Sequence, residues 1–298
     1  MSIRNNIITA EDIKSFGSRK RDELAAMKSY RDLGMFTLAL ILAVFFIFPF
    51  YWLLKVSIAF PPTSLYGRVP SLLLENPSIN NFVRVWHAIP FSRYLMNSII
   101  LSVVAVSGQL IFCSMAAYAL TKEFFGKRFI VIAIIFALMV PFQTIFLPDY
   151  LVVQRLGLVN TYTGLIMIWT VSLINTMVIR NSFEAIPKAM EDAARLDGAS
   201  ELYILFGVYW PLSKPALATT VIIGFIFSWN SYLWPLLVVT EMDIAPLPLG
   251  LVRFAGNLTG NFALQYAFAM MVLIPMLVVF LLLQKQFIKS AVLGSIKT

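Results

Sequence analysis

The sequence predicts an all-α integral membrane protein with six transmembrane helices and a short cytoplasmic helix between the fourth and the fifth. Composition, the length of the apolar runs and the placement of basic residues lead to this prediction. Of the 298 residues, 59% are hydrophobic and 13% are charged, whereas about 25% of the residues in an average soluble protein are charged. The composition therefore excludes a soluble enzyme and places the chain in a lipid bilayer.

Six apolar runs have about the 20 residues that a helix needs to cross the hydrocarbon layer. They lie at 34–56, 95–120, 129–148, 162–179, 216–240 and 264–284. We divide the chain into an amphipathic cytoplasmic segment at 1–33, a transmembrane domain at 34–284 and a cytoplasmic tail at 285–298. Thr9 and Asp12 have the spacing of a capping box, which predicts a surface helix that runs along the membrane up to Gly34.

The basic residues predict the orientation. Most of the 23 Lys and Arg residues fall in the N-terminal segment, in the second-to-third and fourth-to-fifth loops, and in the tail. Cytoplasmic loops carry such an excess, so we expect both termini in the cytoplasm. The net charge of +8 then reflects the cytoplasmic placement of basic residues, which face anionic lipid. We predict no nucleic-acid partner.

Groups suited to metal binding or catalysis are scarce. Cys113 and His87 are the only residues of their types, which excludes an intramolecular disulfide, a cysteine metal cluster and a histidine relay. We predict no metal site, an apolar environment for Cys113 and a loop or surface helix for His87. The second to sixth runs contain no Asp, Glu, Lys, Arg or His, although ion-coupled carriers place such residues in the membrane. We therefore expect another protein to supply the energy for transport.

The loop at 181–214 has the pattern of a helical hairpin. Pro187 suits the first turn of a helix, residues 188–196 favour helix, and Gly198 can adopt the left-handed backbone that ends one. A second helix is predicted from about Ser200 to Pro211. The small residues of the first helix permit close approach to a groove on another protein, and a carboxylate beside the glycine can accept backbone N–H bonds.

Several motifs carry a family resemblance. The spacing Asp192-Ala-Ala194, three residues, Gly198, nine residues, Val208-Tyr-Trp-Pro211 resembles the Glu-Ala-Ala loop of the membrane subunits of binding-protein-dependent ATP-binding-cassette importers. The motif acid is usually Glu, so Glu191 and Asp192 both remain candidates for it. The segments 141–150, 156–161 and 227–230 are similar to maltose-type sugar importer subunits, and 286–297 resembles the tail of their six-helix subunit, which reaches the ATPase dimer interface.

The resemblance implies a permease subunit that moves a sugar or oligosaccharide by alternating access, in the cytoplasmic membrane of a bacterium or archaeon. It implies three partners: a cytoplasmic ATPase dimer, a second homologous membrane subunit and an extracytoplasmic solute-binding protein. The chain itself would be no enzyme and bind no cofactor, with ATP and Mg²⁺ held by the ATPase, and it lacks a G-x-x-x-x-G-K-[ST] motif. The residues implied in ATPase coupling are Pro187, Glu191, Asp192, Ala193, Ala194, Arg195, Asp197, Gly198, Ala199 and Pro211.

Contacts with the substrate are predicted from side-chain type. Amide, hydroxyl and aromatic groups bind neutral sugars, and such groups lie in or beside the spans at Asn97, Asn175, Ser228, Trp229, Asn230 and Tyr232. The same groups can instead join helices by hydrogen bonds. Two other functions remain open, a secondary carrier and a membrane scaffold that docks a soluble partner. The sugar, and whether it is neutral or anionic, also stays open.

Overall fold

The structure is a computed structural model that describes residues 10–59, 72–73, 76–257 and 262–295, with side chains at 33–59, 72–73, 76–256 and 262–284. These residues form helices joined by turns, with an isolated bridge between Ala59 and Pro77. The all-α prediction is confirmed. The capping box at Thr9 and the side chains of the tail lie outside the described residues. The chain divides into two units, Met1–Lys55 and Val56–Thr298.

Helix α1 (Ala10–Ser57) is continuous over 48 residues. Its apolar part, Leu33–Ser57, is long enough to cross a membrane and matches the first expected span. The expected end of a separate surface helix near Gly34 is wrong, because α1 runs through this position. A single glycine inside a helix costs only about 1 kcal/mol relative to alanine, and the residues on both sides favour helix.

Two further apolar helices match the second and the sixth expected spans. The first, Phe91–Thr121, consists of α3 (Phe91–Gly108), the π-helical turn η2 (Gln109–Cys113) and α4 (Ser114–Thr121). The second is Phe262–Gln284, the apolar part of α15 (Phe262–Ser295).

The third expected span is bent rather than straight. Helix α5 (Lys127–Met139) meets α6 (Phe142–Arg155) at 103°. Pro141 has no N–H with which to continue α5, and it forces the preceding Val140 into an extended conformation, with ψ of 124°. The span predicted at 129–148 ends at Pro148, but Pro148 lies inside α6.

The fourth expected span is also bent. Helix α7 (Tyr162–Ile166) and the 3₁₀ turn η3 (Met167–Trp169) meet α8 (Leu173–Glu184) at 44°. Ser172 is extended at the break, and its hydroxyl caps α8 by accepting a hydrogen bond from the backbone N–H of Asn175 at 3.3 Å.

The fifth expected span consists of α12 (Lys214–Trp229), a break at 230–232 and the short helix α13 (Leu233–Val238). Three short helices occupy the flanking segments: α2 (Asn80–Ala88), η5 (Met242–Ile244) and α14 (Leu247–Asn257). His87 is exposed on α2, as expected for a surface helix.

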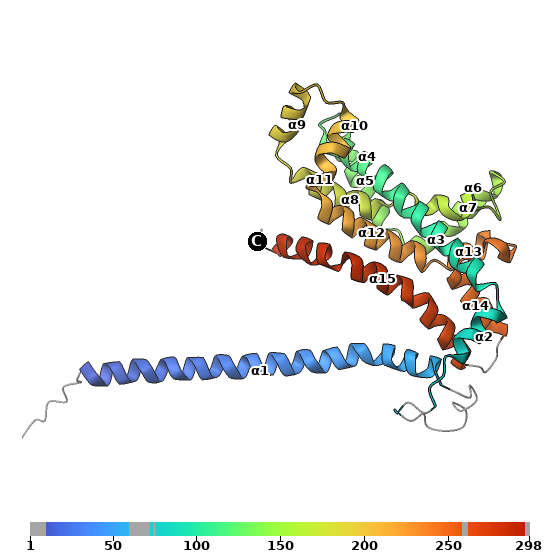
Figure 1. Ribbon diagram of the computed structural model, residues 1–298. Coiled ribbons are helices and arrows are strands. Elements are labelled where there is room, and N and C mark those ends of the chain that lie inside the picture. Colours follow the sequence, from blue (N-terminus) through green and yellow to red (C-terminus); the bar gives the residue numbers. More distant parts are fainter. Residues whose placement is uncertain (1–9, 60–71, 74–75, 258–261, 296–298) are drawn as a thin grey trace, which may run out of the picture. The chain divides into compact units, whose positions relative to one another are not determined.

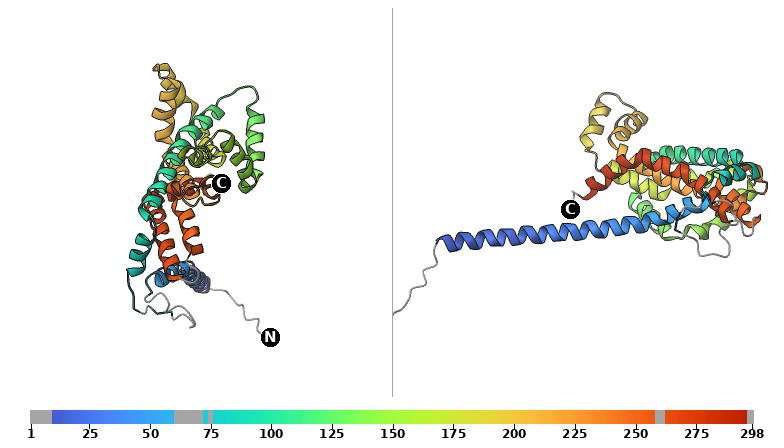
Figure 2. Two further views of the ribbon diagram at one scale, coloured as in Figure 1. Left: turned by 90° about the vertical axis from the view of Figure 1, so that its right-hand side faces the viewer. Right: turned by 60° about the horizontal axis from the view of Figure 1, so that its bottom comes forward.

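Within the second unit, α12 packs against α3, α8 and α15 (Figure 1). The larger core surrounds Trp229, Trp234 and Phe268. Helix α2 and helices α13 and α14 lie at one end of this bundle. The segment that contains α9 (Lys188–Leu196) and α10 (Glu201–Tyr203) projects from the other end (Figures 1 and 2). Helix α15 runs from the α14 end toward the α9 end. The projecting segment is the 181–214 loop.

Candidate functional site

The loop begins with helix α9 (Lys188–Leu196), which follows Pro187. Gly198 ends the helix in the left-handed conformation, with φ of +80°. Its N–H donates to the carbonyl of Arg195 at 3.0 Å, and the N–H of Ala199 donates to that of Ala194 at 3.0 Å. These two bonds form a Schellman motif. The hydrogen bonds described at this turn come from the main chain, so the expected capping of the turn by a carboxylate is wrong.

The second part of the loop starts at Ser200, whose hydroxyl accepts a hydrogen bond from the backbone N–H of Tyr203. Helix α10 (Glu201–Tyr203) continues into the π-helical turn η4 (Ile204–Tyr209) and then α11 (Trp210–Leu212). The chain therefore forms the hairpin that the pattern of proline, glycine and serine predicts.

A small apolar core attaches this hairpin to the bundle. Its buried members are Cys113, Ala117, Tyr118, Ile179, Phe183, Ile204, Leu205 and Tyr209. They come from η2, α4, α8 and η4, and the partly buried Ala194 and Ala199 pack against them. The Tyr209 ring lies edge-on to those of Tyr118 and Phe183, with centroids 5.1 and 5.0 Å apart. The loop thus has its own packed contact with the ends of α4 and α8.

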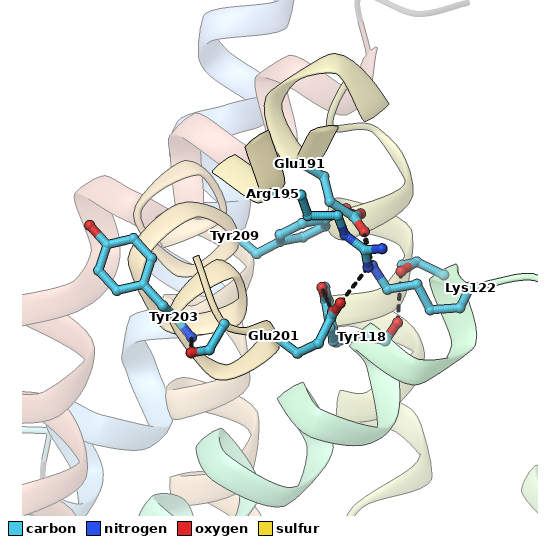
Figure 3. Close-up of polar contacts among 9 residues, drawn as sticks. Tyr118, Lys122, Glu191, Arg195, Glu201, Tyr203 and Tyr209 are labelled. Carbon is cyan, nitrogen blue, oxygen red and sulfur yellow. Dashed lines mark hydrogen bonds and ion pairs between the residues drawn. The ribbon is translucent and has the colours of Figure 1, made fainter. Parts of the chain in front are cut away.

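Above this core lies a network of charged and phenolic groups, which we name the Glu191 network (Figure 3). Glu191 forms ion pairs with Lys122 and, at 2.9 Å, with Arg195, and its Oε2 accepts a hydrogen bond from the hydroxyl of Tyr209 at 2.7 Å. Glu201 pairs with Arg195 at 2.5 Å and accepts a hydrogen bond from Tyr118 at 2.5 Å. The network therefore joins α9 to α10, to η4 and to the end of α4.

The electrostatics of Glu191 favour its charged form. Burial alone would raise the pKa of this carboxyl group. Hydrogen bonds from Lys122 and Tyr209, and the charges of Lys122 and Arg195, outweigh burial and lower the pKa below its ordinary value. The ammonium group of Lys122 also lies 3.9 Å from the ring centroid of Tyr118, where a cation is attracted by the ring face.

The two candidate motif acids have different environments. The Glu191 side chain is 13% exposed within the network, whereas Asp192, Ala193 and Asp197 are exposed. Ala194 faces inward, so a substitution there would disturb packing in addition to any docking contact. Pro211 is exposed at the start of α11.

Four members of the Glu191 network are not among the residues predicted from the sequence: Tyr118, Lys122, Glu201 and Tyr209. Tyr118 lies in a predicted span and Lys122 in a basic loop, both far from Glu191 in the sequence. Leu196, which is 90% exposed at the tip of α9, is likewise not predicted. Its position between the charged residues Arg195 and Asp197 is the signal that the sequence offers for it. Beside it, a groove of about 730 Å³ is lined by α9, the turn and Tyr203.

Three of the six substrate-contact candidates, Asn97, Ser228 and Trp229, are buried and bonded within the bundle, and two of them, Asn97 and Trp229, join separate helical elements. The amide of Asn97 donates to the carbonyls of Asp243 and Ala245 at 2.9 and 3.0 Å and accepts from the Tyr162 hydroxyl. Ser228 donates to the carbonyl of Gly224 within its own helix, and Trp229 donates to that of Val272. These bonds join α3 to the η5 segment and α12 to α15.

Of the other three candidates, Asn230 and Tyr232 lie together in the break after α12, and Asn175 lies apart from them in α8. Asn230 donates to the carbonyl of Ile226, and Tyr232 is 44% exposed beside it. Asn175 alone of the six lines the cavity of about 650 Å³ that lies between α5, α6, η3 and α8. It bonds there to Gln109, a residue that the sequence analysis did not select.

Comparisons with known proteins agree with this architecture. The family model for the binding-protein-dependent transport system inner membrane component matches residues 109–289. The arabinooligosaccharide transport permease AraQ of Halalkalibacterium halodurans is 33% identical over 84% of this chain and 91% of its own length. The trehalose/maltose transport permease MalG of Thermococcus litoralis is 34% identical over 87% of this chain and 94% of its own length. A solved bacterial ABC transporter that imports the acidic polysaccharide alginate matches with a TM-score of 0.75 and 31% identity over 87% of this chain and 98% of that chain.

Proposed function

Because the chain belongs to the family of binding-protein-dependent transport system inner membrane components, we propose that it is the permease subunit of an ATP-binding-cassette importer for a sugar or oligosaccharide. The named relatives are sugar permeases, and the match to AraQ and MalG extends over more than four fifths of the chain. The observation that carries the mechanism is the hairpin at 181–214, which is tied to α4 and α8 and leaves one side free.

We count the bent pairs α5–α6 and α7–α8 as one span each and α12 with α13 as another, which gives six crossings with the three long apolar helices. The hairpin end of the second unit then faces the cytoplasm, in agreement with the basic residues Lys122, Lys127 and Arg128 near it. Helix α15 runs toward the same end (Figure 1), which agrees with a cytoplasmic tail in a multi-pass protein of the cytoplasmic membrane.

In this assignment α9 is the coupling helix. ATP would be bound with Mg²⁺ and hydrolysed by a separate cytoplasmic ATPase dimer, whose closure moves the docked helix. The small core and the Glu191 network would pass this motion to α4 and α8 as a rigid unit. Asp192, Ala193 and Leu196 would contact the ATPase, because they are exposed on α9.

Two further partners complete the importer. A second, homologous membrane subunit would supply the other half of the pathway. An extracytoplasmic solute-binding protein would deliver the substrate at the opposite end of the bundle, where α2 and α14 lie (Figure 1). The substrates named for AraQ and MalG favour an oligosaccharide.

Leu196→Asp tests the proposed docking. A charge replacing an apolar side chain that enters a partner's pocket should remove most of the affinity, so we expect the tagged complex to lose its ATPase on purification and to lose ATP-dependent sugar uptake. Phe125→Asp is the matched control, because Phe125 is also fully exposed and lies in the loop that follows α4.

We expect the control to keep the ATPase and normal membrane insertion. Retention of the ATPase by Leu196→Asp, with undiminished uptake, would contradict the assignment of α9. Uptake driven by an ion gradient without any ATPase would favour the secondary carrier instead.

A further inference from the structure

The cavity between α5, α6, η3 and α8 is separate from the hairpin, and none of its lining residues lies in the hairpin. Its volume of about 650 Å³ falls within the range of small-molecule binding sites. Gln109 of η2 and Gly224 of α12 form part of its wall, together with Phe142, Trp169, Asn175 and Phe227. Both polar and aromatic groups therefore face the same space.

Two amide side chains in this wall are fixed in position. The amide N–H of Gln109 donates to the carbonyl of Trp169 at 2.6 Å, and that of Asn175 donates to Oε1 of Gln109 at 2.6 Å. The space for the Gln109 amide exists because residue 224 is glycine, since a Cβ there would lie 2.3 Å from Oε1. The π-helical turn at 109–113 places Gln109 at this point, and such turns recur at functional sites.

Two polar atoms in the wall have no hydrogen-bond partner within the described part of the chain. They are the indole N–H of Trp169 and Oδ1 of Asn175. Trp169 is 7% exposed and Asn175 is fully buried. Because a buried polar group without a partner is costly, an unpaired donor and an unpaired acceptor at one cavity point to a ligand that provides both. Hydroxyl groups donate and accept.

The aromatic rings and the single ionisable group of the lining select among such ligands, and most of the other lining residues are aliphatic. The rings of Phe142 and Trp169 lie 5.3 Å apart in a tilted arrangement, and Phe227 adds a third aromatic surface, which suits the apolar C–H faces of a sugar ring. Asp149 is the ionisable residue among those that line the described cavity, and neither Lys nor Arg is among them. An anionic sugar would meet a carboxyl group there and find no cation to pair with.

We propose that this cavity is a subsite for an uncharged, hydroxyl-rich sugar residue and that it disfavours uronates and sugar phosphates. The inference rests on the proposed importer function and deepens it by naming the charge class of the substrate. The chain would thus differ in preference from its solved relative, which imports the acidic polysaccharide alginate.

Protection of an introduced thiol tests the proposal in the reconstituted complete importer. Val171→Cys places a thiol in the cavity wall at a position that is 53% exposed, and Val103→Cys is the matched control, 58% exposed and outside the wall. The native Cys113 is fully buried, so unsubstituted importer gives the background of maleimide labelling. One probe is a mixture of arabinotriose, maltose and raffinose. The other is a mixture of alginate trisaccharide and sn-glycerol 3-phosphate.

We expect the neutral mixture to slow labelling at position 171 and to leave position 103 unchanged, while the anionic mixture protects neither. The proposal would be overturned if the anionic mixture protected position 171 as well as the neutral mixture or better. It would also be overturned if the neutral mixture and the anionic mixture both failed to protect position 171. ATP-dependent uptake is measured in the same vesicles. Uptake without protection rejects the subsite alone, whereas failure of uptake with the ATPase present rejects the importer function.

A second variant isolates one hydrogen bond. Trp169→Phe keeps an aromatic ring and removes the indole N–H, so we expect the KM for neutral sugar to rise about two- to tenfold, the effect of one hydrogen bond, with kcat nearly unchanged. Trp52→Phe is the control, because Trp52 lies in α1, outside both the cavity wall and the hairpin. An unchanged KM in Trp169→Phe would contradict a contact with the sugar.

Discussion

The hydroxyl of Tyr209 donates a hydrogen bond of 2.7 Å to Oε2 of Glu191, which joins the second half of the hairpin to the helix proposed to dock the ATPase. The other carboxylate oxygen of Glu191 pairs with Lys122 at the end of α4 and with Arg195. A single carboxylate therefore holds three segments together. This makes Glu191 a positioning residue inside the hairpin, while Asp192, its neighbour, is exposed.

Glu191→Gln should loosen the hairpin without unfolding the bundle. The substitution preserves shape but removes the charge that Lys122 and Arg195 face, and the loss of charged hydrogen bonds costs about 2 kcal/mol. We expect amide hydrogen exchange across residues 188–200 to become faster and ATP hydrolysis to become less tightly linked to uptake. Asp192→Asn is the control, and equal protection of the hairpin in Glu191→Gln and the unsubstituted chain would show that the network does not stabilise it.

The lowered pKa of Glu191 predicts a pH dependence. A carboxyl group whose pKa is lower in the folded state contributes stability that is complete above its unfolded pKa, about 4.3 for glutamate, and that disappears as the pH falls through the folded value. The difference in hairpin opening between the unsubstituted chain and Glu191→Gln should therefore be constant from neutral pH to about 5 and shrink at lower pH. Hydrogen exchange, corrected for intrinsic rates, measures it. A difference that grows on acidification would contradict the assigned sign.

Gly198→Ala should weaken the hairpin through backbone strain alone. A Cβ at Gly198 meets no atom within 4 Å, but φ is +80°, a conformation that costs a non-glycine residue about 1 kcal/mol or somewhat more. Gly198→Asn should lose less, because asparagine tolerates this region. Gly34→Ala is the opposite control, since Gly34 has equal space within a regular helix and alanine should stabilise it. Hydrogen exchange across 188–200 checks the order of the two Gly198 variants, and exchange across α1 checks Gly34→Ala. Equal exchange in Gly198→Ala and Gly198→Asn would refute the strain argument.

Local signals in the sequence predict the hairpin well. Pro187, Gly198 and Ser200 each act on their own turn, so their effects do not depend on the rest of the fold, and α9 and its Schellman motif follow from them. Long apolar runs likewise predict spans, because run length is the physical requirement. Predictions from local signals are wrong where two signals in the same segment favour different structures. Gly34 does not end α1, because the helix formers around it outweigh one glycine, and Pro141 rather than Pro148 breaks the third span.

Contacts between distant segments could not be predicted. Lys122 pairs with Glu191 across 69 positions of sequence, and nothing near Lys122 indicates its partner. Asn97 has the residue type of a sugar ligand, yet its amide is saturated by Asp243, Ala245 and Tyr162. Side-chain type alone does not distinguish packing from binding. The distinction needs the bonding partners, so only the fold separates Asn175 from the other predicted residues and adds Gln109, which the sequence did not indicate.

Gly224→Ala tests whether the Gln109 amide must occupy its observed position. The new methyl group would lie 2.3 Å from Oε1 of Gln109 and 3.1 Å from its Cδ, so the amide must move and release the N–H of Asn175. Overpacking of this kind costs about 1–3 kcal/mol. We expect the variant to insert and to retain its ATPase, because the hairpin is distant in the fold, but to take up neutral sugar with a raised KM.

Adding Gln109→Asn to Gly224→Ala supplies the decisive comparison. The shorter amide withdraws from the new methyl group by one methylene and keeps both a donor and an acceptor near Asn175, so uptake should partly recover. Gly256→Ala is the control, because a Cβ there meets nothing within 4 Å. If the double variant transports no better than Gly224→Ala, the defect arises from helix packing around α12. Gly224 is then not required to leave room for the Gln109 amide. Recovery shows that the glycine is required because it leaves room for the amide.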